Sequence, residues 1–127
     1  MENGAVQTIH VDHANKLVDV RLSGFFSAED VGWTGEELRA AVRTLGENIG
    51  AHVTLYDVSD ALVAPPETVE ALKQSFANPA VRPLWARKVA FCASSALVRM
   101  QLKRLQQVRA DIGVFEDRAS ALKWLLA

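Results

Sequence analysis

Residues 52–58, HVTLYDV, decide the fold, because apolar side chains fall on both faces of this short run. A half-buried strand alternates apolar and polar residues, whereas a strand covered on both faces is apolar throughout. Double coverage is typical of parallel or mixed sheets with helices on each side. We therefore predict that residues 52–58 form the central strand of an α/β domain.

Two strands are expected ahead of this segment. Residues 6–12 mix β-branched and polar types, and residues 16–23 alternate cleanly. In the second run Val18, Val20 and Leu22 share one face, opposite polar residues. The short polar link at residues 13–15 predicts an antiparallel hairpin.

Helices are expected between the later strands. Ser27 has a capping hydroxyl and is followed by acids, so it predicts a helix start. Gly32 and Gly35 weaken this helix, which we expect to be bent or to begin late. Pro65 and Pro66 introduce a second helix, since proline suits a first helical turn.

The remaining chain continues this alternation. We expect a strand over residues 88–93, a helix over 95–109, a strand over 111–116 and a last helix after Asp117. The predicted order is ββαβαβαβα, with about five strands in a mixed sheet and about four flanking helices. The length of 127 residues fits one domain, residues 1–127.

Composition excludes several classes of protein. Half of the residues are hydrophobic and 23% are charged, which excludes a disordered chain. The N-terminal residues lack a signal-peptide pattern, and no apolar run is long enough to span a membrane. The single cysteine, Cys92, lies in an apolar run and is expected to be a buried hydrophobe. We expect a cytoplasmic protein.

The net charge of −1 hides a separation of charge along the chain. Residues 71–110 contain eight basic residues and no acid, whereas the rest contains six basic and fifteen acidic residues. The simplest interpretation is a solvent-exposed surface with one positively charged and one negatively charged region. The alternatives are a dimer formed by self-association or contact with an acidic protein, with nucleic acid or a membrane less favoured.

The first candidate site follows the central strand. Asp57, Ser59 and Asp60 stand at its carboxyl end, where ligands bind in open α/β sheets. The alternative is that the aspartates only make hydrogen bonds within a turn. Ser94 and Ser95 open a helix one turn before Arg99, which suggests either an anion site or an ordinary cap.

Two tryptophans suggest contact surfaces. Trp33 lies off the apolar stripe of its helix, and Trp85 lies in a proline-bounded basic loop. No familiar catalytic, nucleotide-binding or metal-ligand motif is present. The sequence thus indicates no catalytic residue, no cofactor and no metal.

Three patterns, in this order, give the chain its resemblance to a known family. They are VRLSGFFSAEDV at 20–31, TLYDVSD at 54–60, and RKVAFCA at 87–93 followed by IGVFEDRASALKWL at 112–125. Together they resemble the SpoIIAA-like branch of the STAS superfamily, the anti-sigma-factor antagonists. This bacterial-type branch is also likened to CRAL-TRIO lipid-transfer domains. The resemblance covers nearly the whole chain.

The resemblance implies a regulatory function, but one residue position departs from the family pattern. Typical STAS antagonists are phosphorylated on a serine at the start of the helix after the central strand. That position falls near Pro65, Pro66 and Glu67 here, and Thr68 is the nearest hydroxyl. The resemblance therefore implies the fold without the usual phosphoserine switch.

Three hypotheses of function follow. The first is a non-enzymatic regulatory domain that binds a protein partner or small ligand near residues 57–68 and Trp33. The second is a carrier of a small apolar or lipid ligand, held between helix and sheet near Trp33 and Phe76. The third is a phosphorelay member that uses Ser59 or Thr68.

Overall fold

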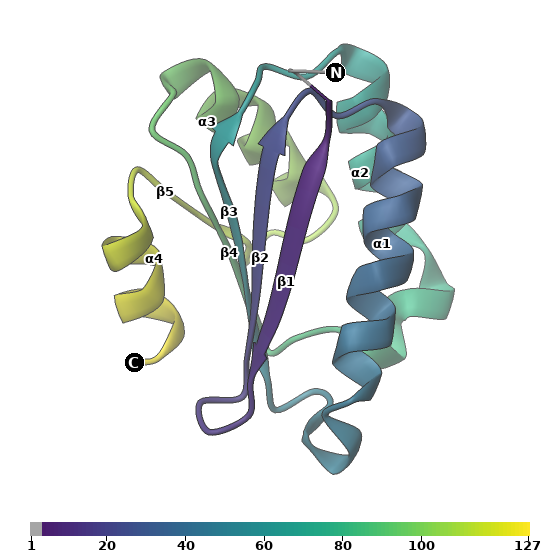
Figure 1. The fold of residues 1–127 in the computed structure, drawn as a ribbon, viewed down its shortest axis with the longest axis vertical. Helices are drawn as coiled ribbons and strands as arrows, with labels where there is room; N and C mark the ends of the chain where they lie inside the picture. The colour runs from purple at the N-terminus through teal and green to yellow at the C-terminus, as the bar shows by residue number, and fades with distance from the viewer. Residues whose placement is uncertain (1–3) are drawn as a thin grey trace.

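Five strands form one mixed sheet with β3 at its centre (Figure 1). The computed structural model describes residues 4–127. The sheet order is β1-β2-β3-β4-β5, with β1 antiparallel to β2 and every other pair parallel. The predicted hairpin and central strand are confirmed. The strands are β1 (Val6–Asp12), β2 (Leu17–Gly24), β3 (Val53–Ala61), β4 (Lys88–Cys92) and β5 (Gly113–Phe115).

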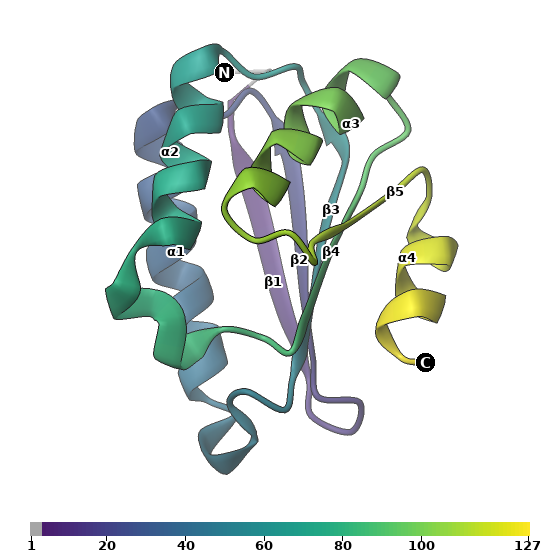
Figure 2. The same cartoon turned by 180° about the vertical axis from the view of Figure 1, so that it is seen from behind.

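Helices cover both faces of the sheet, as Figure 2 shows from behind. One face carries α1 (Ala28–Arg43), α2 (Pro66–Ala77) and α3 (Ala96–Lys103), and the other carries α4 (Arg118–Leu125). Side chains alternate across β3, so Tyr56 and Val58 belong to the larger core beneath α1–α3, and Leu55 to the smaller core beneath α4. This arrangement explains why residues 52–58 are apolar on both faces.

Local capping signals set three of the helix starts. The Ser27 hydroxyl accepts from the Asp30 amide, and the Asp30 carboxylate accepts from Ser27 in return, which completes a capping box. Ser95 and Asp117 cap α3 and α4 in the ordinary way. Pro66 occupies the first turn of α2, where a missing amide hydrogen costs nothing.

Several predicted boundaries are wrong. The first helix begins at Ala28, immediately after its cap, despite Gly32 and Gly35. Its capping box and its buried side chains on the sheet outweigh the low helix propensity of glycine. The helix predicted over 95–109 ends at Lys103 and continues only as a 3₁₀ turn to Gln107.

The central strand runs three residues beyond its predicted end. Arg21 pairs with Asp57 and Ser23 pairs with Asp60, so β3 has one more residue than β2 between these pairs. This is a β-bulge, and the Asp57 carboxylate accepts the Ser59 amide across it at 3.1 Å. The expected turn after residue 58 is therefore a bulged strand end, and Asp57, Ser59 and Asp60 all lie within β3.

Candidate functional site

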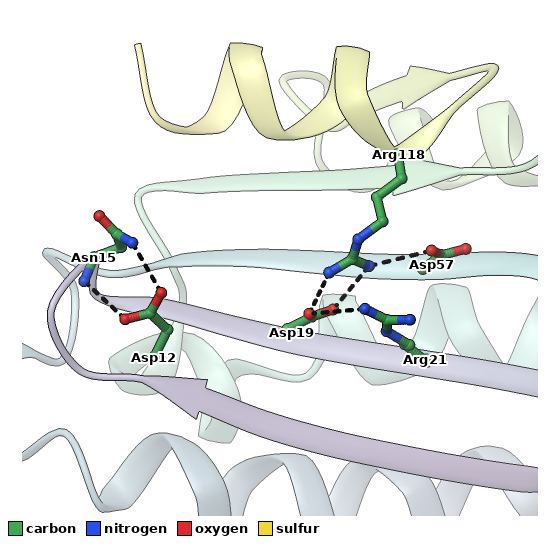
Figure 3. Close-up of polar contacts among 6 residues, drawn as sticks. All are labelled: Asp12, Asn15, Asp19, Arg21, Asp57 and Arg118. Atoms are coloured by element: carbon green, nitrogen blue, oxygen red, sulfur yellow. Dashed lines mark hydrogen bonds and ion pairs between the residues drawn. The ribbon is translucent and has the colours of Figure 1, made fainter.

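Arg118 joins three elements on the α4 face of the sheet (Figure 3). It is the first residue of α4 and reaches Asp19 on β2 and Asp57 on β3. Its Nη1 donates to Asp19 Oδ1 at 3.1 Å and to Asp57 Oδ2 at 3.2 Å, and its Nη2 donates to Asp19 Oδ2. Arg21 lies outside this cluster, with its nearest nitrogen 3.9 Å from Asp19.

The pKa values in this cluster favour a fixed ion pair. Burial raises the pKa of Asp57, but hydrogen bonds from Ser59, Arg118 and Cys92 outweigh it, so the pKa is lowered. Burial and the neighbouring Asp57 charge raise the pKa of the Cys92 thiol to about 12. A neutral buried thiol is a poor nucleophile, in keeping with the prediction that Cys92 packs as a hydrophobe.

The predicted residues at the end of β3 border a surface hollow. Its volume is about 160 Å³. Ser59 and Asp60 are exposed beside it, whereas Asp57 is mostly turned into the ion-pair cluster. The hollow is lined by Val6, Thr8, Arg21, Leu22, Ser23, Asp57, Ser59 and Asp60.

Exposed apolar side chains gather at the same end of the sheet. Among residues 4–127, eight large hydrophobic side chains are exposed, and six belong to segments at the carboxyl end of the parallel strands, at the top of Figure 1. Contiguous exposed apolar patches on proteins commonly mark interaction sites. We call this group the carboxyl-end patch; it consists of Val6, Phe25, Leu62, Val63, Leu97 and Met100.

Reciprocal hydrogen bonds hold two parts of the patch together. The Ala64 amide donates to Gln101 Oε1 at 3.1 Å, and Gln101 Nε2 donates to the Ala64 carbonyl at 2.6 Å. This pair ties the loop that carries Leu62 and Val63 to α3, which carries Leu97 and Met100.

A cavity of about 160 Å³ lies between α1, α2, α3 and the sheet. Its lining is mostly apolar and includes Tyr56, Phe76 and Phe91, whose rings pack together. Of the two residues named for this pocket from the sequence, Phe76 lines it and Trp33 does not: the Trp33 side chain is 43% exposed on α1. Trp85, proposed only as a contact residue, lines it too. The expected pocket is therefore present, without Trp33 in its wall.

Thr68 occupies an interior position at the start of α2. It is 1% exposed, and its hydroxyl donates to the Phe26 carbonyl at 2.9 Å. A kinase cannot reach a hydroxyl buried in this way. The exposed hydroxyl of Ser59 has no such obstacle.

The segment around Ser94 has the geometry of an ordinary cap. The Ser95 hydroxyl accepts the Val98 amide at 3.3 Å. Arg99 donates to the carbonyls of Ala93 and Ser94 at 2.8 and 2.9 Å, and lies 3.9 Å from Glu116. Its guanidinium is thus already engaged by oxygen atoms.

Sequence reasoning missed the most connected residues. Asp19 appeared only as a polar residue on an alternating strand, and Arg118 only as part of the last helix. The two residues are 99 positions apart in the sequence, so no local pattern predicts their contact. Arg109, which lines the cavity, was counted only as one basic residue among eight.

Within residues 4–127, no group of three or more His, Cys, Asp and Glu side chains is placed to hold a metal ion. No helix in the same part of the chain is long and apolar enough to cross a membrane.

Comparisons with known proteins identify the fold. A scan against protein-family models gives no match, and a search of curated proteins gives none either. Among solved structures, an anti-sigma factor antagonist from Mycobacterium paratuberculosis is similar over 98% of this chain and 97% of its own, with a TM-score of 0.61 and 13% identity. An uncharacterised DUF3478-family protein from Shewanella loihica PV-4, described as having a SpoIIAA-like fold, matches over 96% of this chain and 93% of its own, with a TM-score of 0.64 and 18% identity. The chain therefore has a SpoIIAA-like fold.

Proposed function

We propose that the chain is a non-enzymatic, STAS-like regulatory domain that binds another protein through the carboxyl-end patch. The observation that carries this proposal is the concentration of six of the eight exposed large hydrophobic side chains of residues 4–127 at one end of the sheet. Burial of such side chains is the main source of affinity in protein interfaces. One of the similar structures is an anti-sigma factor antagonist, which agrees with a regulatory function.

The charged surroundings of the patch favour a protein partner with polar edges. Asp60 and Glu67 flank Leu62 and Val63, and Lys103 follows Met100 on α3. An apolar centre with a charged rim is the usual anatomy of a protein interface. Because Thr68 is buried and hydrogen-bonded, we propose that binding does not depend on its phosphorylation.

Site-specific photocrosslinking in the native host tests this proposal. A photoreactive residue replaces Leu97 in the patch or Leu126 outside it; these side chains are 62% and 46% exposed. We expect a discrete crosslinked protein from position 97 only. The partner so identified is then purified and titrated, and Leu97→Glu should weaken its binding at least about ten-fold, whereas Leu126→Glu should not.

Two outcomes of this experiment would overturn the proposal. One is crosslinking to the same partner from both positions, with equal losses of affinity in the two variants. The other is crosslinking at position 97 only to a second copy of this chain, confirmed by sedimentation of a dimer. That result would make the patch a self-association surface.

A second candidate function is the binding of a small apolar ligand in the cavity. The specific observation in its favour is a mostly apolar space of about 160 Å³ inside the larger core. A cavity of similar size, about 150 Å³, lined by apolar side chains binds benzene in another protein. Native mass spectrometry of protein purified from cells should reveal a retained ligand, and a mass equal to the bare chain would count against this function.

A further inference from the structure

The cavity between α1, α2, α3 and the sheet collects polar atoms that lack a partner. Among residues 4–127, five buried side-chain nitrogen or oxygen atoms have no hydrogen-bond partner. Three of them, Thr34 Oγ1, Trp85 Nε1 and Arg109 Nη1, belong to side chains that line this cavity. Buried polar groups are nearly always paired with protein or with ordered water, so three unpartnered groups on side chains that line one cavity mark where a water molecule or a ligand supplies the missing partners.

Arg109 is held firmly while one of its nitrogens stays free. Its Nε donates to Asp111 Oδ1 at 2.9 Å, and its Nη2 donates to the Ala86 carbonyl at 2.7 Å. The side chain is 7% exposed, and its guanidinium carbon lies 4.7 Å from the centre of the Trp85 ring. A preorganised charged donor of this kind loses little entropy when it binds an anion.

The chemistry of these unpartnered atoms specifies the polar head group of the ligand. An indole N–H and a guanidinium can only donate hydrogen bonds. Trp85 and Arg109 therefore require acceptor atoms, and the positive charge of Arg109 favours an anionic acceptor. The Asp111 carboxylate is 65% exposed, so water screens its competition for this charge.

The rest of the cavity specifies the body of the ligand. The rings of Tyr56 and Phe91 stack with centroids 4.5 Å apart, and Phe76 meets both edge-on at 6.3 Å. All three line the cavity, whose volume of about 160 Å³ is close to the benzene-binding size. Aromatic side chains favour further aromatic contacts in offset or edge-on geometry.

We propose that the cavity binds a small aromatic carboxylate, with its ring among the apolar side chains and its carboxylate at Arg109 and Trp85. This inference rests on the second proposed function and adds the head group of the ligand to it. Thr34, on α1, offers a further hydrogen bond to a polar substituent on the ring.

The test compares phenylacetate with toluene, which has a similar ring and no carboxylate. Binding of each is followed by NMR titration of the backbone amides of the residues that line the cavity and, for phenylacetate, by calorimetry. We expect phenylacetate to bind at least about ten-fold more tightly than toluene and to shift the Trp85 indole resonance. Equal affinities would overturn the carboxylate site and leave the apolar-ligand function standing, whereas no binding of either probe would overturn both.

Variants locate the carboxylate within the cavity. Arg109→Gln and Trp85→Phe should each reduce the preference for phenylacetate over toluene by several-fold, since each removes one donor. The matched control is Arg82→Gln, because Arg82 also lies over the Trp85 ring, at 5.2 Å, but does not line the cavity. An equal loss of preference in the control would overturn the assignment. Trp85→Phe and the wild-type probe ratio still decide the matter if Arg109→Gln does not fold.

Discussion

Replacing Arg118 by methionine should destabilise the fold far more than the same change at Arg21. Both arginines approach Asp19 on the same face of the sheet. The Arg118 side chain is 28% exposed and its two carboxylate partners are 11% and 14% exposed, whereas Arg21 is 60% exposed and 3.9 Å from Asp19. The two substitutions remove the same charge from very different environments.

The magnitude follows from what each substitution leaves behind. Breaking a fully buried pair costs about 3–5 kcal/mol, and an exposed pair contributes about 0–1 kcal/mol. The Arg118 cluster is partly exposed, so we expect Arg118→Met to lower the free energy of unfolding by about 2 kcal/mol, since it leaves two carboxylates without their shared cation. For a chain of this size that is roughly 8 °C in Tm. Arg21→Met should cost less than about 0.5 kcal/mol.

The pH dependence gives a second, independent signature. The folded-state pKa of Asp57 is lowered, so its contribution to stability is present above its unfolded value, near 3.8, and is lost as pH falls through the folded pKa. The cost of Arg118→Met should therefore be largest at neutral pH and shrink in acid, as the Asp57 carboxylate becomes protonated. Urea unfolding of both variants at neutral pH and at about pH 3 measures this. A cost of Arg118→Met no larger than that of Arg21→Met, or a cost that is the same at both pH values, would refute this prediction.

Three other substitutions or conditions test separate parts of the structure. Burial lowers the pKa of His52, so the unfolded state takes up a proton before the folded state does as pH falls through about 6.5. The free energy of unfolding should therefore decrease between about pH 7.5 and 5.5. His52→Gln should make this decrease smaller, as measured by urea unfolding at several pH values. The Cys92 thiol, with its pKa raised to about 12, should stay unreactive to a thiol-specific reagent at about pH 8 and react fully in urea; fast reaction of the folded protein would contradict its burial. A Cβ at Gly113 would lie 2.6 Å from the Phe115 ring and 3.1 Å from the Trp124 ring. Gly113→Ala should therefore lower the free energy of unfolding by about 1–3 kcal/mol, measured by calorimetry. An unchanged Tm would show that both rings move aside freely.

Local chemistry explains why much of the fold could be predicted. The polar link at residues 13–15 gives a tight turn in which Asp12 accepts hydrogen bonds from Asn15. Ser27 and Asp117 cap helices through residues only three positions away. Such signals lie within one turn of the chain, so the sequence displays them directly.

Features set by pairing between distant segments were harder to predict. The end of β3 depends on β2, because Ser23 and Gly24 continue to pair with Asp60 and Ala61 beyond the bulge. A run of Ser and Asp has low strand propensity, and tertiary pairing overrides it. The Arg118 cluster is another case, since its three members come from β2, β3 and α4. The cavity, finally, depends on how three helices pack, which no single segment encodes.

The patch and the cavity share part of their boundary, which couples their proposed occupants. Leu62 belongs to the carboxyl-end patch and also lines the cavity. Ala64 and Gln101 line the cavity as well, and their paired hydrogen bonds hold two parts of the patch together. A ligand that moves this loop changes the surface that the partner meets, and thermodynamic linkage then requires the partner to change the affinity of the ligand by the same factor. Saturating phenylacetate should thus alter the Kd of the crosslinked partner, and Gln101→Leu should weaken that effect because it removes both bonds to Ala64. If phenylacetate leaves the Kd of the partner unchanged, the loop does not couple the two sites, and the patch and the cavity bind independently.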